Sequence, residues 1–414
     1  MKTFAYLLQL VTSAIALTLV SCSNLETTSS LDSNSESKPI STASTAIDSS
    51  NNNLASNLSA NSTGQRFKKV VLAKGLERPW GMASLPDGSI LITERVGKVK
   101  LFRNRSVKQV EISGIPDLFV SGQGGLMDIS LHPRFRDNNL VYLTYSKGNF
   151  QANHTSILRV KFDGKSLIEP KVIFEVKPDK TGNQHFGSRI VWLPDETMLI
   201  AIGDGGNPPL QLEGELVRKQ AQKLDSQLGK ILRLKDDGSI PKDNPFIEAE
   251  KANPFVWSYG HRNIQGLFAD NVSGKIWATE HGSRGGDELN LVKAGKNYGW
   301  PIVTFSQEYT GGSISEDTSR PDMVDPKLVW TPAIAPSGLV LYRGDRLPLW
   351  KGNLFVGGLV SKEVIRIKIE NDQPVIKETI PIGQRVRDVR EGIDGCIYIL
   401  TDEKSGQLIR LEPI

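Results

Sequence analysis

The stretch Trp80–Glu94, with the sequence WGMASLPDGSILITE, sets a pattern that returns along the chain. Two short apolar runs flank the turn Pro86–Gly88, and the basic run Lys98–Phe102 follows. Pro, Asp and Gly favour tight turns, and short apolar runs bounded by such turns are typical of β-strands. The stretch therefore predicts a unit of three or four short antiparallel strands.

Five further copies of this pattern follow the first. They begin at Gly125, Ile190, Gly266, Gly338 and Val386. The charged connector Leu216–Leu224 is the one expected helix. Regular four-stranded units predict an all-β fold, specifically a six-bladed β-propeller with four-stranded antiparallel blades. The run Phe67–Ala73 precedes the first copy, and its pairing with the last copy would close the ring and cover exposed sheet edges.

Composition places the chain among soluble globular proteins. Of its 414 residues, 38% are hydrophobic and 23% are charged. The formal net charge of +4 is small for this length, so the sequence implies no strongly basic face and we expect no nucleic-acid partner. Beyond the N-terminal segment, no run is apolar enough to predict a membrane span.

The N-terminus has the composition of a targeting signal. Lys2 supplies a positive charge, the run Phe4–Val20 is largely apolar, and Leu19–Cys22 reads LVSC. LVSC resembles the bacterial lipobox, in which the cysteine carries lipid after cleavage; the alternative is a plain signal peptide with an incidental cysteine. We expect residues 1–21 to be a lipoprotein signal peptide. The exported protein would be anchored through lipid on Cys22 to a bacterial membrane, facing the periplasm or the cell exterior.

Residues 22–66 and residues 67–414 differ in composition. The first segment is rich in Ser, Asn and Thr, so it has too little apolar surface to offset the entropy of ordering, and we expect a disordered tether. The second segment carries all the strand-like copies and is expected to be the propeller domain. Its cysteine, Cys396, lies in an apolar run, which favours a buried structural thiol.

The stretch Trp257–Trp300 combines several groups that can bind a ligand. Arg262 and Asn263 offer a guanidinium fork beside an amide, which suits a planar anion. The glycine-rich run Gly282–Gly286 lets backbone carbonyls approach an ion, and Asp287–Glu288 offers oxygen ligands of the kind that Ca²⁺ takes. A tight turn with a solvated acid and a surface Arg-Asn pair remain open as alternative interpretations.

Five further polar side chains lie next to strands of different copies. Gln123 precedes the second copy, His185 precedes the third, and Asp204 follows a strand of the third. Arg385 and Arg387 open the sixth copy, and their alternation along a strand directs both side chains to one face. Loops that precede the inner strands of a propeller converge on one end of its central channel. We therefore expect these five side chains and the Arg-Asn pair to face one pocket.

Taken together, these segments resemble a known family, the soluble pyrroloquinoline quinone (PQQ) sugar dehydrogenases, in particular the bacterial aldose sugar dehydrogenases. The matching segments follow in order from residue 67 to residue 414. They include QGGLMDISLHPRF, HFGSRIVWLPD, SYGHRNIQG, EHGSRGGDELNLVKAGKNYGWP and RVRDV. The resemblance implies a PQQ- and Ca²⁺-dependent oxidoreductase that converts aldose sugars to lactones at the anomeric hydroxyl. It also implies an external electron acceptor, either a quinone or a redox protein.

The resemblance assigns roles to single residues. His185 corresponds to the general base that takes a proton from the sugar hydroxyl, and Asp204 to the carboxylate that orients it. The positions that correspond to cofactor-binding residues are Gln123, Arg262, Asn263, Tyr309, Val360, Ser361, Lys362, Arg385, Val386 and Arg387. Among the other histidines, His132 and His261 are expected to be structural.

Metal and substrate positions follow from the same resemblance. The metal positions are Gly282 and Ser283, through their carbonyls, for a Ca²⁺ on the cofactor, and Glu288 and Tyr298 for a second, structural Ca²⁺. Gln184 and Trp330 correspond to substrate contacts. The chain departs from sugar-specific members where Gln184 replaces an acid, Val360 a lysine and Ser283 a proline. A backbone carbonyl ligand survives the last change, whereas the first leaves the identity of the sugar open.

Two other function classes fit an extracellular propeller. A cofactor-free binding module needs neither a general base nor inward-facing arginines. Propellers host many chemistries, so the site decides among them. A Ca²⁺-dependent lactonase-type hydrolase needs several side-chain carboxylates that converge on a central metal.

Overall fold

A computed structural model describes residues 64–414 of the chain. The predicted signal peptide, the lipidation site Cys22 and the tether up to residue 63 lie outside the described residues. From residue 64 onward the chain forms 26 β-strands, the four-residue helix α1 (Phe135–Asn138), and two short 3₁₀ helices. The all-β prediction is confirmed. None of the helices in this range is long and apolar enough to cross a membrane.

The connector that the sequence predicted to be helical contains less helix than expected. It holds only the 3₁₀ helix η1 (Val217–Gln222), which follows a hairpin of β12 (Gln211–Leu212) and β13 (Glu215–Leu216). Its apolar side chains Val217 and Ala221 are buried, and the helix ends at Lys223, whose extended backbone (φ −83°, ψ 118°) cannot continue a helix. The other 3₁₀ helix, η2 (Pro348–Trp350), begins at a proline.

The two ends of the described chain meet in one sheet. Its strands, in spatial order, are β1 (Phe67–Leu76), β26 (Gly406–Pro413), β25 (Ile397–Thr401) and β24 (Val386–Glu391). β1 pairs antiparallel with β26, so that Phe67 lies opposite Pro413. The predicted pairing of the run before the first copy with the last copy is therefore confirmed.

Three more sheets have four strands each, in sequence order. The first contains β10 (Ile190–Trp192), β11 (Met198–Ile202), β14 (Lys230–Leu234) and β15 (Val256–Tyr259). The second contains β16 (Ile264–Asp270), β17 (Lys275–Glu280), β18 (Asp287–Val292) and β19 (Leu328–Trp330). The third contains β20 (Pro336–Leu341), β21 (Asn353–Gly358), β22 (Glu363–Glu370) and β23 (Gln373–Pro381).

The remaining eight strands form one continuous sheet. Its spatial order is β2 (Pro79–Ser84), β3 (Ile90–Glu94), β4 (Lys98–Arg103), β5 (Ser106–Ile112), β9 (Ser166–Glu175), β8 (Asn153–Phe162), β7 (Leu140–Gly148) and β6 (Leu126–Leu131). The two antiparallel halves are joined by a short parallel pairing, in which Glu111 and Ile112 lie opposite Ser166 and Leu167.

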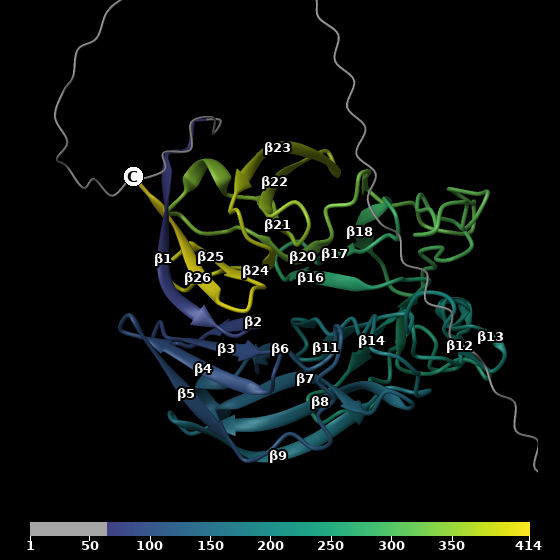
Figure 1. Cartoon of the computed structure of the whole chain (residues 1–414), viewed down its shortest axis with the longest axis horizontal. Helices are drawn as coiled ribbons and strands as arrows, with labels where there is room; N and C mark the ends of the chain where they lie inside the picture. The colour runs from purple at the N-terminus through teal and green to yellow at the C-terminus, as the bar shows by residue number, and fades with distance from the viewer. Residues whose placement is uncertain (1–63) are drawn as a thin grey trace, which may run out of the picture. The chain divides into compact units, whose positions relative to one another are not determined.

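Six edge strands of the sheets lie innermost: β2, β6, β10, β16, β20 and β24. β2 contacts β6 and β24, β10 contacts β6 and β16, and β20 contacts β16 and β24, so these six inner strands contact one another in a closed cycle. Figure 1 shows the sheets extending outward from them, with β5, β9 and β23 at the periphery. The starts of the inner strands are therefore brought together, and this positions the site described below.

Hydrophobic cores fill the space between neighbouring sheets. Val340 and Phe355 of one sheet, for example, pack with Val389 and Ile399 of the next. Each such apolar side chain stabilises the fold by about 1.5–3 kcal/mol when fully buried. Cys396 is a free, buried thiol that belongs to a neighbouring core, so the prediction of a structural thiol is confirmed.

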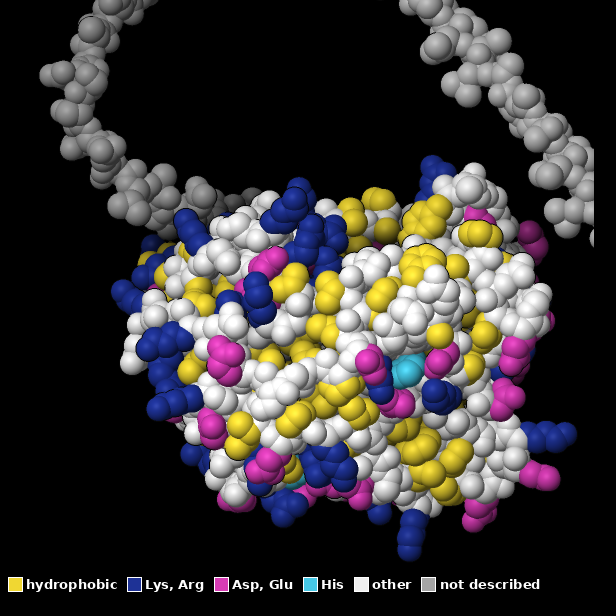
Figure 2. Space-filling view, turned by 60° about the horizontal axis from the view of Figure 1, so that its bottom comes forward, with side chains coloured by type: hydrophobic (Ala, Val, Ile, Leu, Met, Phe, Trp, Pro, Cys, Tyr) yellow, Lys and Arg dark blue, Asp and Glu magenta, His cyan; other side chains and the backbone are white. Residues whose placement is uncertain are grey.

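Charged side chains of both signs share the surface. On the face shown in Figure 2, Lys and Arg are interspersed with Asp, Glu and uncharged side chains. Many of them form exposed ion pairs, such as Arg103 with Asp87 at 2.8 Å. Exposed pairs of this kind contribute little to stability, so the buried cores between the sheets hold the fold together.

Candidate active site

A cavity of about 240 Å³ lies where the six inner strands begin. Each inner strand, or the loop just before it, contributes to its wall. The contributing residues include Trp80 from β2, Gln123 before β6, Phe186 and Gly187 before β10, Gln265 from β16, Ala335 before β20, and Arg385 and Arg387 at β24. The predicted convergence of Gln123 with the two arginines on one cavity is thus present in the structure.

His185 and Asp204 form a buried pair beside this cavity. Nδ1 of His185 lies 2.6 Å from Oδ1 of Asp204, and the two side chains are 3% and 0% exposed. Asp204 is held in turn, because Oδ2 accepts a hydrogen bond from Nε1 of Trp300 at 2.7 Å and Oδ1 accepts one from the amide of Gly206 at 3.0 Å. The carboxylate can therefore neither rotate nor move away from the imidazole.

The backbone around His185 is constrained. His185 has φ 48°, a left-handed conformation that is uncommon for a non-glycine residue and often marks functional sites. Oε1 of Gln123 accepts a hydrogen bond from the His185 amide at 2.9 Å. A Cβ on Gly203 would lie 2.1 Å from the His185 carbonyl oxygen, so this close approach requires glycine. Gln123 and Gly203 together fix the loop that presents the imidazole.

The environment favours the neutral form of His185. Burial lowers the pKa of its imidazole; Asp204 opposes this effect and the Arg262 guanidinium adds to it. With Nδ1–H directed at Asp204, Nε2 is the acceptor, and among the described residues no hydrogen-bond partner of Nε2 is present. A neutral imidazole with one anchored and one free nitrogen is suited to accept a proton from a ligand.

A buried lysine, Lys180, lies near this pair. Nζ of Lys180 donates a hydrogen bond to Oδ1 of Asn153 at 2.9 Å and lies 3.9 Å above the ring of Phe186. Burial lowers the pKa of Lys180 to about 7, with Asp204 opposing the shift. Lys180 therefore titrates in the same pH range as many histidines, although its amine does not line the cavity.

Arg262 connects the His185 pair to the neighbouring sheet. Its Nη2 donates a hydrogen bond to Oδ1 of Asn207 at 2.7 Å, and its Nη1 donates one to the carbonyl of His281 at 3.1 Å. The amide of Asn207 also binds the side chain of Gln184 at 3.0 Å. The predicted substrate position Gln184 thus lies within one contact network with Arg262.

Three buried donors in this region lack a hydrogen-bond partner: Nε of Arg262, Nδ2 of Asn263 and Nε of Arg387. The rest of the Arg387 guanidinium is engaged, by Oε1 of Gln265 at 3.1 Å and by Oδ2 of Asp402 at 2.5 Å. Unpaired buried donors are costly, so their presence points to a missing acceptor. A planar anion that carries several carboxylates fits this donor set.

The glycine-rich loop is held by one carboxylate. Oδ1 of Asp287 accepts from the Gly282 amide at 2.8 Å, and its Oδ2 accepts from the amides of Ile334 and Ala335 at 2.7 and 2.8 Å. A Cβ on Gly282 would lie 2.1 Å from the carbonyl oxygen of Gly285, so the loop cannot form without this glycine. Asp287, offered by the sequence as an oxygen donor for a cation, instead orders the loop.

Glu288 and Tyr298, the positions predicted for a second Ca²⁺, point to different partners. Oε2 of Glu288 accepts from Nδ2 of Asn290 at 3.1 Å, and burial together with the neighbouring charge of Glu280 raises its pKa. The Tyr298 hydroxyl instead donates to the carbonyl of Leu291 at 2.8 Å. Between residues 64 and 414 no three His, Cys, Asp or Glu side chains group as a metal site, so a cation here would depend on backbone carbonyls.

The other predicted positions are spread around the cavity. Ser283 and Tyr309 line a separate hollow of about 460 Å³, and Tyr309 is 60% exposed. Val360 is 59% exposed, and neither it nor Ser361 or Lys362 lines the cavity, although the preceding residue Leu359 does. The remaining two are Val386, which is buried in β24, and Trp330, whose buried Nε1 has no partner. Of the residues expected to face one pocket, Gln123, Arg385 and Arg387 line the cavity. The His185–Asp204 pair, Arg262 and Asn263 are not among its lining residues and belong to the hydrogen-bond network around it.

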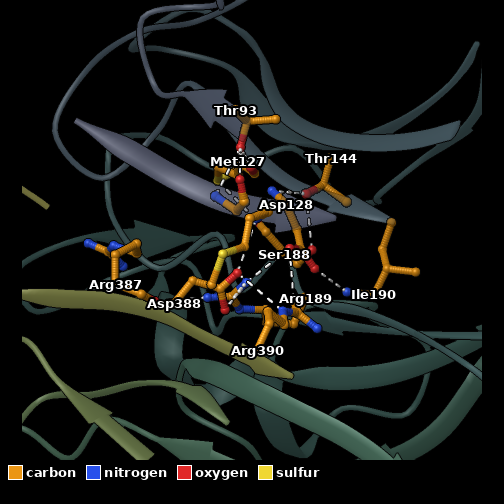
Figure 3. Close-up of polar contacts among 12 residues, drawn as sticks. Thr93, Met127, Asp128, Thr144, Ser188, Arg189, Ile190, Arg387, Asp388 and Arg390 are labelled. Atoms are coloured by element: carbon orange, nitrogen blue, oxygen red, sulfur yellow. Dashed lines mark hydrogen bonds and ion pairs between the residues drawn. The ribbon is translucent and has the colours of Figure 1, made fainter. Parts of the chain in front are cut away.

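Several residues of the site were not singled out by the sequence. Trp80, Gln265 and Asp402 line the cavity, as do Arg78 and Arg95. Behind its wall lies a group of charged side chains, Asp128, Arg189, Asp388 and Arg390, drawn in Figure 3. For Asp128, Arg189 and Asp388 the available signal was their place inside the matching segments QGGLMDISLHPRF, HFGSRIVWLPD and RVRDV, each of which also carries a cavity residue; Arg390 directly follows the last of these.

The chain is similar to known sequences over most of its length. Residues 76–410 match the model of the family described as Glucose / Sorbosone dehydrogenase. Aldose sugar dehydrogenase YliI of Escherichia coli strain K12 is 37% identical over 353 residues, which cover 83% of this chain and 92% of that protein.

Two solved structures show the same architecture. The soluble aldose sugar dehydrogenase from Escherichia coli, in its apo form, matches with a TM-score of 0.78 and 36% identity, covering 84% of this chain and 100% of that one. The PQQ-bound aldose sugar dehydrogenase from Streptomyces coelicolor matches with a TM-score of 0.66 and 26% identity, covering 84% and 99%. These neighbours are β-propellers, so the all-β fold described above is of the propeller type.

Proposed function

The chain belongs to the Glucose / Sorbosone dehydrogenase family, and on this premise we propose that it is a PQQ- and Ca²⁺-dependent aldose dehydrogenase. The family makes it an oxidoreductase that acts on sugars. In the proposed reaction the anomeric hydroxyl loses a proton, the anomeric carbon loses a hydride, and the product is a lactone. The electrons then pass to an external acceptor, a quinone or a redox protein.

The proposal is carried by one observation, the buried His185–Asp204 pair with a free Nε2 beside partnerless donors. Nε2 takes the proton of the anomeric hydroxyl, and Asp204 stabilises the imidazolium that forms. PQQ, when bound, supplies the two-electron acceptor. The relative from Streptomyces coelicolor is described as PQQ-bound, which supports this choice of cofactor.

The chain's own residues would hold the cofactor from several sides. The carboxylates of PQQ would take the unpaired donors of Arg262, Asn263 and Arg387, with Arg385 beside them. The carbonyls of Gly282 and Ser283 would hold Ca²⁺, since between residues 64 and 414 no three His, Cys, Asp or Glu side chains group as an alternative metal site. We further propose six four-stranded blades, counting the eight-stranded sheet as two units joined between β5 and β9.

The lactonase-type alternative finds less support. It requires carboxylates that are free to hold a metal in the cavity. Asp204 is bound to His185, Trp300 and Gly206, while Asp402 is bound to Arg387. These two carboxylates are therefore already engaged.

Reconstitution tests the proposal. Purified protein is mixed with PQQ, Ca²⁺, both or neither, and dye reduction is followed with a panel of aldoses and alcohols. We expect sugar-dependent dye reduction only when both are present. Absence of PQQ binding would contradict the proposal, while tight PQQ binding without turnover of any aldose would favour a cofactor-carrying sensor.

The location at a membrane is a separate part of the proposal. It rests on the LVSC segment, Leu19–Cys22, which ends at the proposed lipidation site. We expect Cys22→Ala to release the protein from the membrane fraction, because a single signal peptide leaves no other anchor after cleavage. If the variant stays with membranes after a salt wash, lipidation at Cys22 does not anchor the protein.

A further inference from the structure

Four charged side chains, three of them buried and Arg390 partly exposed, form a closed group behind the cavity wall, which we call the central quartet: Asp128, Arg189, Asp388 and Arg390 (Figure 3). Nη1 of Arg189 lies 2.9 Å from Oδ1 of Asp128 and 3.1 Å from Oδ1 of Asp388. Arg390 binds the same two carboxylates at 3.2 and 3.1 Å. Two guanidinium groups thus neutralise two carboxylates in the middle of the molecule.

Arg189 also reaches the cavity wall with its remaining donors. Its Nε donates a hydrogen bond to the carbonyl of Gln265 at 2.8 Å, and its Nη2 donates one to the carbonyl of Arg387 at 3.0 Å. Its guanidinium lies 4.3 Å from the ring centre of Trp80. All three of these partners line the cavity, whereas Arg189 is 1% exposed and does not.

The contacts of Arg189 converge on one cavity-facing hydrogen bond. Nη1 of Arg387 donates to Oε1 of Gln265, and Arg189 holds the backbone of both of these residues. Arg387 also lies 5.6 Å from the ring of Trp80, and Arg189 lies over the same ring. The placement of the Arg387 guanidinium, with its partnerless Nε, therefore depends on Arg189.

We propose that Arg189 is a positioning residue that sets the affinity of the cavity for an anionic cofactor by holding Arg387, Gln265 and Trp80 in place. This inference rests on the proposed function for the identity of the anion. A planar guanidinium can serve two carboxylates and two carbonyls at once, whereas a lysine ammonium offers three donors without a fixed plane. The requirement is thus for arginine and not only for a positive charge.

The arrangement explains the composition of three segments of the chain. Gln123 and Asp128, His185 and Arg189, and Arg387 and Asp388 each lie within one short segment. The first residue of each pair is either a cavity-lining residue, Gln123 or Arg387, or the candidate base His185. The second residue of each pair belongs to the central quartet. A single strand start thereby places one side chain in the site and one in the group that supports it.

A purely stabilising role makes a different prediction, and the chain offers a matched control. Arg366 of β22 is 3% exposed and binds Glu378 at 2.6 Å and Asn353 at 2.8 Å, and neither of these two partners lines the cavity. Arg366→Lys and Arg189→Lys both weaken a buried arginine site. Only the second should alter ligand affinity if Arg189 positions the wall.

The experiment measures the dissociation constant of PQQ by equilibrium dialysis at a temperature where both variants are folded by circular dichroism. We expect Arg189→Lys to raise the constant roughly tenfold or more, as when a hydrogen bond to a charged group is lost. We expect Arg366→Lys to lower Tm without changing the constant, and kcat of Arg189→Lys at saturating PQQ to stay close to the wild-type value. A lowered Tm with unchanged PQQ affinity in Arg189→Lys would overturn the inference.

Two further measurements cover the remaining outcomes. If Arg189→Lys does not fold, Asp128→Asn removes one carboxylate from Arg189 and should weaken PQQ binding in the same direction; unchanged binding there also overturns the inference.

If the wild-type protein binds no PQQ, the proposed function fails and the inference is judged on crystal structures without cofactor. Loss of the Arg387–Gln265 hydrogen bond in the Arg189→Lys crystal would then support it, and retention of that bond would refute it.

Discussion

Two regions of the molecule place a buried histidine against a buried carboxylate, and they differ in what the second imidazole nitrogen contacts. His185 lies 2.6 Å from Asp204, and His261 lies 3.0 Å from Glu280. Nε2 of His261 is 2.9 Å from the hydroxyl of Ser258, and its ring stacks on Tyr298 at 4.7 Å. Nε2 of His185 has no partner among the described residues, and the two residues that follow His185 line the cavity.

A buried histidine–carboxylate pair is therefore not sufficient to make the histidine a general base. Glu280 is fully occupied, because it also accepts from the Arg262 amide at 2.7 Å and from Nδ2 of Asn290 at 3.0 Å. His261 therefore connects two sheet edges with both of its nitrogens. His185 keeps one nitrogen free, and this freedom separates a candidate catalytic group from a structural one.

The largest effect on turnover is expected when the imidazole of His185, with its free Nε2, is removed. We expect His185→Ala to lower kcat by roughly 10²–10⁴, the usual contribution of a positioned general base. Steady-state dye reduction with PQQ and Ca²⁺ at saturation measures the loss. A kcat equal to that of the wild type would place His185 with His261 among the structural residues.

Removing the carboxylate alone should cost less. In Asp204→Asn the imidazole remains, but its orientation and the stabilisation of the imidazolium are weakened, so we expect a loss of roughly 10- to 100-fold in kcat. The same steady-state assay compares the two variants. An Asp204→Asn loss larger than that of His185→Ala would mean that Asp204, and not the histidine, carries the proton transfer.

The pH dependence sharpens the comparison further. Burial lowers the pKa of His185 below its usual value near 6.5, so the imidazole is neutral at pH 7 and becomes protonated only as the pH falls. We expect kcat/KM to decrease at acidic pH, about tenfold per pH unit below that pKa, since only the neutral form accepts a proton. Asp204→Asn removes a contribution that raises the pKa, so its acidic limb should move to lower pH.

Lys180 supplies the control for this profile. Its pKa is lowered to about 7, so it is the other buried group near Asp204 that titrates in this range. Lys180→Met should leave the acidic limb of kcat/KM in place. Disappearance of the limb in Lys180→Met would assign it to the lysine.

The smallest effect on turnover is expected at the other histidine. In His261→Gln, Glu280 loses its 3.0 Å contact in a buried setting, which should destabilise the fold by about 1–3 kcal/mol. Activity at a temperature well below Tm should stay within about threefold of the wild type, because no group that faces the cavity is removed. Denaturant unfolding and steady-state assays on one preparation measure both. A kcat loss as large as that of His185→Ala would erase the difference between the two pairs.

The sequence predicted the strands, the closure of the ring and part of the cavity lining, because these features follow from residues close together in the chain. Turn residues between short apolar runs predicted the strands, the run at Phe67 predicted closure with the last copy, and the alternation of Arg385 and Arg387 predicted a shared cavity. Each of these follows from strand periodicity or from the order of the copies.

Features that depend on contacts between distant residues were not accessible in this way. The parallel pairing of β5 with β9 joins two units that the pattern treats as separate. Asp287 binds amides 47 and 48 residues away, so a residue that resembles a metal ligand serves the backbone. Arg189 and Arg387 are 198 residues apart, and only the folded ring shows that one guanidinium holds the other.

The central claim is that His185 removes the proton while other residues hold the cofactor, and one measurement tests it most directly. PQQ affinity and the single-turnover rate of sugar-dependent reduction of bound PQQ are determined on the same preparation of His185→Ala. The account predicts a nearly unchanged affinity, because Arg262, Asn263 and Arg387 remain, and a reduction rate that falls by roughly 10²–10⁴. An unchanged reduction rate would contradict it, and so would a collapse of PQQ affinity with a normal rate in the fraction that still binds.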